Sequence, residues 1–107
     1  MPKKKTAYDI AVGGRLRLAR RALGKSAVEI ADGINVSIAR YSNWERGENG
    51  ADPEVLARVK KEFGISLDWL YADDILSLGP DLADKVRKLR IAEIPKVDQS
   101  KRTRKTA

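Results

Sequence analysis

The most informative segment of the chain is residues 26–47, SAVEIADGINVSIARYSNWERG. Ser26 can cap a helix, and Glu29 three residues later completes the pattern of a capping box. Asn35 follows as the residue that, after glycine, best tolerates a left-handed turn. Ser37 then stands where it can cap a second helix. The segment therefore predicts two short helices joined by a tight turn.

The apolar residues of this segment indicate how the two helices pack. Tyr41 and Trp44 lie three residues apart, so both are expected to face the core and to leave the rest of their helix outward. Ala31 is small enough to lie where the helices cross, and Val36 can fill the turn. Four side chains of the first helix are expected to face the core: Val28, Ile30, Ala31 and Ile34. This is the helix-turn-helix arrangement, whose second helix, here Ser37–Arg46, can enter a DNA major groove.

Helix signals continue on both sides of this segment, and no strand-like alternation of any length occurs. The further helices expected from apolar periodicity, caps and stops are residues 9–23, 53–63, 67–71 and 81–94, with a connector at residues 75–80. Asp52 precedes Pro53 as a cap, and Pro95 ends the last helix. The fold class is therefore all-α, with a basic arm before the domain and a basic tail after it.

Charge is concentrated at the two ends of the 107-residue chain, which is the size of one domain. Residues 3–5 carry +3 and residues 101–105 carry +4, and together these equal the net charge of +7. We expect residues 1–8 to be a flexible arm and residues 96–107 to be disordered. Two interpretations of these tails stay open, solubility or loose contact with phosphates.

The residue inventory argues against catalysis and metal binding. The chain has no cysteine and no histidine, so thiol nucleophiles and the commonest acid–base residue and metal ligand are missing. The acidic residues of positions 68–84 lack the spacing of a calcium loop, and no phosphate-binding loop of the GxxxxGK type occurs. We expect no enzyme activity, no cofactor and no small-molecule ligand. No apolar run reaches the roughly 18 residues of a membrane span, and the N-terminus lacks a signal peptide, so a cytoplasmic protein is expected.

The chain also resembles a known family, the lambda-repressor-like, Cro/XRE-type helix-turn-helix regulators. The resemblance covers about residues 10–74, and its most specific parts are SNWERG, the proline that opens the next helix, and GISLDWLYADD. It implies a five-helix DNA-binding domain at residues 9–74, whose third helix enters the major groove, usually as a dimer on a two-fold-related site. Residues 75–95 would add a connector and a C-terminal helix.

The resemblance also implies which residues contact DNA. The expected base contacts are Ile38, Ala39, Arg40 and Asn43. The expected phosphate contacts are Ser26, Ala27, Ser37, Ser42 and Arg46, with Arg15, Arg17 and Lys25 adding charge nearby. In the family the glutamate that matches Glu45 pairs with an arginine of the first helix, for which Arg15 or Arg17 is expected, while Arg20 and Arg21 are expected to be surface charge.

Two departures from the family pattern bear on function. Ala27 stands where the family commonly has a glutamine that braces a phosphate and the recognition helix. Ile38 and Ala39 are apolar at positions usually held by polar residues, and apolar side chains there can pack on thymine methyl groups or face a protein.

The leading hypothesis is a dimeric sequence-specific regulator of double-stranded DNA, a repressor of the phage or prokaryotic type. The alternative is a protein-interaction module that binds RNA polymerase or another protein.

The apolar stripe of the helix predicted at residues 81–94 leaves two alternatives open. The stripe can pack on its own domain, or it can pair with the same helix of a second subunit. Dimerisation is the favoured interpretation, because the resemblance implies a domain that is complete by about Tyr71.

Overall fold

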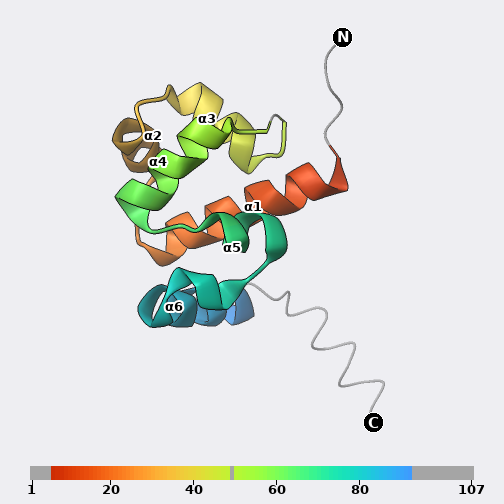
Figure 1. Ribbon diagram of the computed structural model, residues 1–107, viewed down its shortest axis with the longest axis vertical. Helices are drawn as coiled ribbons and strands as arrows, with labels where there is room; N and C mark the ends of the chain where they lie inside the picture. The colour runs from red at the N-terminus through yellow and green to blue at the C-terminus, as the bar shows by residue number, and fades with distance from the viewer. Residues whose placement is uncertain (1–5, 49, 93–107) are drawn as a thin grey trace.

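Helices account for all the regular secondary structure that the computed structural model describes, in residues 6–48 and 50–92. They are α1 (Ala7–Ala22), α2 (Ala27–Gly33), α3 (Ile38–Glu45), α4 (Pro53–Phe63), α5 (Leu67–Ala72), the 3₁₀ helix η1 (Ile75–Leu78) and α6 (Pro80–Ala92). α1 runs through the middle of the molecule, with α2, α3 and α4 on one side and α6 on the other (Figure 1). The all-α fold class is thereby confirmed. The predicted tail at residues 96–107 and most of the predicted arm lie outside the described residues.

Serine and threonine caps explain where most of the helices begin. The hydroxyls of Thr6, Ser26, Ser37 and Ser66 each accept a hydrogen bond from the backbone amide three residues later. Thr6 forms a complete capping box with Asp9, so α1 starts two residues before the position expected from the sequence. Residues 7 and 8 therefore belong to this helix, and the predicted boundary of the arm at residue 8 is wrong.

The turn between α2 and α3 has the predicted geometry. Asn35 adopts a left-handed conformation with φ 59°, and the Val36 amide donates to the Ala31 carbonyl at 3.0 Å. Tyr41 and Trp44 are buried, as the spacing predicted. Val28 was expected inside but is 53% exposed, because it lies about 200° around the helix from Ile30, which is fully buried.

The last helix packs on its own domain. α6 lies against α1 and η1 and buries Leu82, Ala83 and Val86. Its first residue is Pro80, one before the predicted start, and the predicted end at Ile94 lies outside the described residues. Packing within the domain thus accounts for Leu82 and Val86 of the predicted apolar stripe, and their burial gives no support to dimerisation through these residues.

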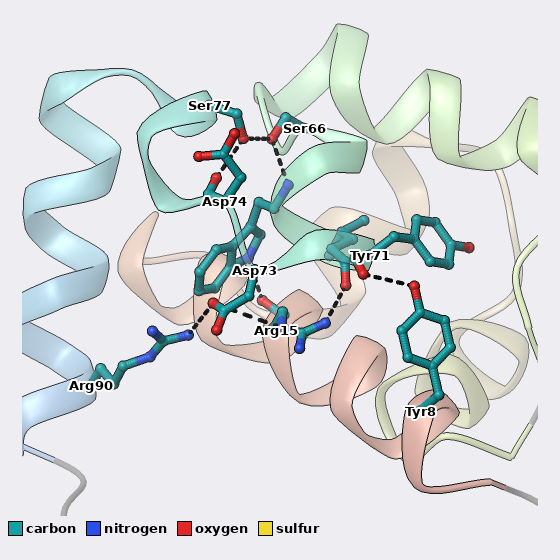
Figure 2. A network of polar contacts seen from close by, with 10 residues as sticks. Tyr8, Arg15, Ser66, Tyr71, Asp73, Asp74, Ser77 and Arg90 are labelled. Atoms are coloured by element: carbon teal, nitrogen blue, oxygen red, sulfur yellow. Dashed lines mark hydrogen bonds and ion pairs between the residues drawn. The ribbon is translucent and has the colours of Figure 1, made fainter.

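A polar network joins α1, α5 and α6 (Figure 2). The indole nitrogen of Trp69 donates to the Arg15 carbonyl at 3.0 Å, and the Arg15 guanidinium donates to the Leu70 carbonyl at 2.7 Å. From α6, Arg90 donates to Asp73 at 3.1 Å, and its guanidinium carbon lies 4.8 Å from the centre of the Trp69 ring system. These contacts make α6 an integral part of the domain.

Candidate nucleic-acid interface

One face of α3 carries both polar and apolar residues and is turned outward, while the opposite face is buried. Ile38, Ala39 and Arg40 are exposed, whereas Asn43 is half-buried. These are the four residues predicted to contact bases, and the structure brings them together on one short helix. Because Tyr41 and Trp44 anchor the opposite face, this surface is held rigidly on the domain.

Two of these four side chains are already oriented by neighbours. An Nη atom of Arg40 lies 3.0 Å from an Asp52 carboxylate oxygen, and the Arg40 guanidinium carbon lies 5.4 Å from the centre of the Trp44 ring system. The Asn43 side-chain oxygen accepts a hydrogen bond from the Arg46 guanidinium. Arg40 and Asn43 are therefore not freely rotating surface groups.

An open groove runs beside this face, between α1 and the two helices of the motif. Its lining residues are Ile10, Gly14, Arg17, Arg20, Ala27, Ser42, Glu45 and Arg46. Three of the predicted phosphate contacts thus border one groove: Ala27, Ser42 and Arg46. Arg17 also lines it and has an exposed side chain. Ala27, at the position where the family commonly has a glutamine, lines this groove with a methyl group only.

The remaining predicted phosphate contacts have other surroundings. The hydroxyls of Ser26 and Ser37 serve as helix caps, accepting from the amides of Glu29 and Arg40 at 3.1 Å each. Lys25 is exposed next to the start of α2. These three residues flank the groove and the exposed face of α3 along the chain, but none of them lines the groove.

Arg15 lies apart from the groove. Its guanidinium donates to the Leu70 carbonyl at 2.7 Å and is 3.9 Å from an Asp73 carboxylate oxygen (Figure 2). Residues two apart on a helix point about 200° away from each other, so Arg15 faces α5 while Arg17 faces the groove. The placement of Arg15 gives no support to a phosphate contact.

Glu45 pairs with Arg20, and the prediction of Arg15 or Arg17 as its partner is wrong. Nε of Arg20 is 2.7 Å from one Glu45 oxygen and Nη2 is 3.2 Å from the other, so the pair has two parallel hydrogen bonds. Both side chains are largely buried, and the hydrogen bond to Glu45 raises the pKa of Arg20 above its usual value. Arg20 is four residues after the buried Leu16 and shares its face, which is the sequence signal that identifies it.

Sequence analysis also missed the role of Gly13. A Cβ atom at this buried position would lie 2.4 Å from the Trp44 carbonyl oxygen and 2.5 Å from the Glu45 carbonyl oxygen. The α1 backbone therefore touches the end of α3 directly. Together with the Arg20–Glu45 pair, this close approach fixes the tilt of α3 relative to α1.

A buried tyrosine completes the junction of α1 and α3. Within the described residues, the Tyr41 hydroxyl has no hydrogen-bond partner. Burial raises the pKa of Tyr41 above its usual value, and the nearby carboxylate of Glu45 raises it further. This hydroxyl therefore stays protonated in the folded protein even where an exposed tyrosine ionises.

Other classes of site find no support in the part of the chain that the structure describes. Residues 6–48 and 50–92 contain no group of three or more acidic residues placed to hold a metal ion. None of the helices described there combines the length and the apolar character needed to cross a bilayer.

The helices, the left-handed turn and the exposed face of α3 define a helix-turn-helix protein. A helix-turn-helix family model matches residues 16–70, and the chain belongs to this family, in its lambda-repressor-like, Cro/XRE-type branch. The chain is 29% identical over 91 residues to the HTH-type transcriptional regulator ImmR of Bacillus subtilis. The aligned region covers 83% of the chain and 72% of ImmR. It is 26% identical over 85 residues to an uncharacterized HTH-type transcriptional regulator of Sinorhizobium medicae, and this alignment covers 77% of the chain.

The alignments also set the extent of the likeness. The chain spans 61% of the length of the Sinorhizobium medicae protein and of a second regulator of the same kind from Rhizobium meliloti, which is also 26% identical. No solved structure is significantly similar to the chain.

Proposed function

We propose that this protein is a transcriptional regulator that binds double-stranded DNA sequence-specifically and acts as a repressor of the phage or prokaryotic type in the bacterial cytoplasm. The observation that carries the proposal is the exposed face of α3 beside a groove bordered by two exposed arginines, Arg17 and Arg46. The kinship with proteins named as HTH-type transcriptional regulators supports the same function.

The side chains on α3 have the chemistry of base recognition. A guanidinium such as that of Arg40 can donate two hydrogen bonds to guanine, and an amide such as that of Asn43 can pair with adenine. Ile38 and Ala39 can pack on thymine methyl groups. The proposal therefore assigns base contacts to these four residues and expects a site that contains both a guanine and neighbouring thymines.

The groove is the proposed site of phosphate contact. Arg17 and Arg46 supply positive charge from α1 and from the end of α3, and Ser42 also lines the groove. Each phosphate that is neutralised releases counterions, so binding should weaken with salt by a log–log slope of about −0.9 per contact. Of the two α1 arginines expected near the phosphates, the proposal keeps Arg17, which lines the groove, and drops Arg15, whose side chain contacts Leu70 and Asp73.

We expect two copies to bind a two-fold-related site, with half-sites about one helical turn apart. A single short helix reads only a few base pairs, so a second copy is needed for useful specificity. Analytical ultracentrifugation with and without the DNA site measures this directly. A complex of one chain per site would contradict it.

The test begins with selection of binding sites from random duplex DNA, followed by affinity measurements on the selected site and on unrelated DNA. Specific binding is expected to exceed non-specific binding by about 10³-fold or more at physiological salt. Arg40→Ala should lose much of this preference. Arg87→Ala is the matched control, because Arg87 is an exposed arginine on α6, on the side of α1 opposite α3 (Figure 1). Equal, weak binding to both DNAs would overturn the proposal.

The exposed apolar residues of α3 favour one second candidate, a protein-interaction module. Ile38 is 43% exposed, and Ala39 is exposed beside it. In this function the same face would dock on RNA polymerase or another protein. A failed selection, together with a complex with purified RNA polymerase that Ile38→Asp abolishes, would favour the module over the DNA-binding regulator.

A further inference from the structure

Asp52 stands at the N-cap of α4 but does not cap that helix. At the starts of α1, α2, α3 and α5 the N-cap side chain accepts a backbone hydrogen bond, whereas the Asp52 side chain makes no such bond. Aspartate at this position ordinarily accepts an amide hydrogen bond from the first turn. Here one carboxylate oxygen instead lies 3.0 Å from Nη2 of Arg40.

The contact leaves most of the Arg40 guanidinium available. A guanidinium has five N–H donors, and Asp52 engages a single nitrogen of Arg40. Trp44, which is buried, is a second and fixed neighbour, with its ring centre 5.4 Å from the guanidinium carbon. Arg40 is thus held by two neighbours, and among the described residues no further partner engages the edge whose two donors match an acceptor pair such as O6 and N7 of guanine.

We propose that Asp52 is a specificity-determining residue, which positions Arg40 for a base and offsets its charge toward the phosphate backbone. This inference rests on the proposed function of the α3 face. Attraction between arginine and phosphate is Coulombic and independent of sequence, so a carboxylate at 3.0 Å weakens it for every DNA. Hydrogen bonds from the free edge to guanine are directional, so they persist. Asp52 therefore lowers non-specific binding more than specific binding.

The size of the effect follows from exposure. The side chains of Arg40 and Asp52 are 53% and 64% exposed, so water screens their attraction. Pairs of this kind change an equilibrium by roughly fivefold or less. The expected effect on discrimination is therefore about two- to fivefold, which equilibrium binding measurements resolve.

The test compares Asp52→Asn with Glu54→Gln. Asparagine keeps the size of the side chain and is a good N-cap, so α4 should remain folded, which thermal unfolding checks. Glu54 is exposed in the first turn of α4, and removing its charge alters the net charge by the same amount. Among the described residues it forms no ion pair with Arg40.

Dissociation constants are measured for the selected site and for unrelated duplex DNA over a series of salt concentrations. Relative to Glu54→Gln, Asp52→Asn should bind unrelated DNA about two- to fivefold more tightly and lose a similar factor in the ratio of specific to non-specific affinity. The log–log salt slope should steepen by about 0.9 as Arg40 becomes free to neutralise a phosphate. In an Arg40→Ala background the effect of Asp52→Asn should vanish.

Two results would overturn the inference alone: equal behaviour of the Asp52 and Glu54 variants, or an Asp52 effect that persists without Arg40. In both, the unchanged protein still prefers its selected site, so the proposed function stands. If the unchanged protein shows no preference for any sequence, the proposed function fails first and this inference fails with it.

Discussion

The close approach of α1 and α3 at Gly13 makes a prediction with an internal control. Gly13 and Gly14 are neighbours in α1, but a Cβ at Gly13 would lie 2.4 Å from the Trp44 carbonyl oxygen, while a Cβ at Gly14 would have nothing within 4 Å. Replacing either residue by alanine gains about the same helix propensity, roughly 1 kcal/mol. The difference between the two variants therefore isolates the contact with α3.

The magnitude follows from the distances. A Cβ atom in ordinary van der Waals contact keeps about 3.4 Å from its neighbour, so Gly13→Ala must push the end of α3 away from α1 by about 1 Å. Overpacking of this kind costs about 1–3 kcal/mol and sometimes more, and here two backbone oxygens are involved, so the upper end applies. After the gain in propensity, Gly13→Ala should lower the free energy of unfolding by about 2 kcal/mol, and Gly14→Ala should raise it by up to about 1 kcal/mol.

Urea denaturation measures both values, with tryptophan fluorescence as the signal because Trp44 and Trp69 are buried. The expected gap of about 3 kcal/mol corresponds to roughly 12 °C or more in Tm for a domain of this size. Binding to the selected DNA should weaken only in the Gly13 variant, since α3 is displaced there. Equal stability of the two variants would refute the direct backbone contact.

The remaining predictions concern the junction of α1 with α3 and the start of α2. Glu45→Leu should cost about 2–4 kcal/mol because it leaves Arg20 unpaired, and the double replacement of Arg20 and Glu45 by leucine should recover most of that loss in the same denaturation assay. Tyr41→Phe should raise stability by about 1 kcal/mol at neutral pH, because it removes a buried hydroxyl without a partner. Burial raises the pKa of Tyr41 above 10.0 in the folded protein, so above pH 10 the unfolded chain loses this proton more readily than the folded one. The free energy of unfolding should therefore fall as pH rises above 10, and the phenylalanine variant should lack this fall. The hydrogen bond from the Ser26 backbone amide lowers the pKa of Glu29 below 4.5 in the folded protein. The stability that the ionised Glu29 provides is therefore present above pH 4.5 and is lost as pH falls through the folded pKa. In an acid titration followed by circular dichroism, Glu29→Gln should lack this loss of stability.

Local signals made most of the fold predictable. Ser26, Asn35 and Ser37 each act within a few residues of their own position, and the structure places each of them as the sequence predicted. The same reasoning missed Thr6, because its capping box with Asp9 precedes the first apolar residue of the pattern. Periodicity also misplaced Val28, since a helix of seven residues has too few positions to define its buried face.

The candidate site was predictable in part. A helix whose buried residues are known has a known outer face, so the exposure of Ile38, Ala39 and Arg40 followed from Tyr41 and Trp44. The partners of the charged residues did not follow in the same way. Arg15 and Arg20 contact groups 55 and 25 residues away. The spacing of Arg20 from Leu16 places it on a buried face of α1, but helix periodicity does not say which distant group each arginine meets.

The position of α1 among its partners also has a consequence for the order in which the protein folds during synthesis. α1 leaves the ribosome before the other described helices, yet its hydrogen bonds to α5 join residues 54 to 63 positions apart, and its packing against α6 spans a longer stretch still. The side of α1 that faces α5 and α6 therefore stays uncovered until these later helices are made, whereas its contacts with α3 can form earlier. We expect α2 and α3 to dock on each other early and α1 to be fixed in place only when α6 has emerged. α1 precedes the other described helices in the chain, yet it would be the last of them to complete its contacts.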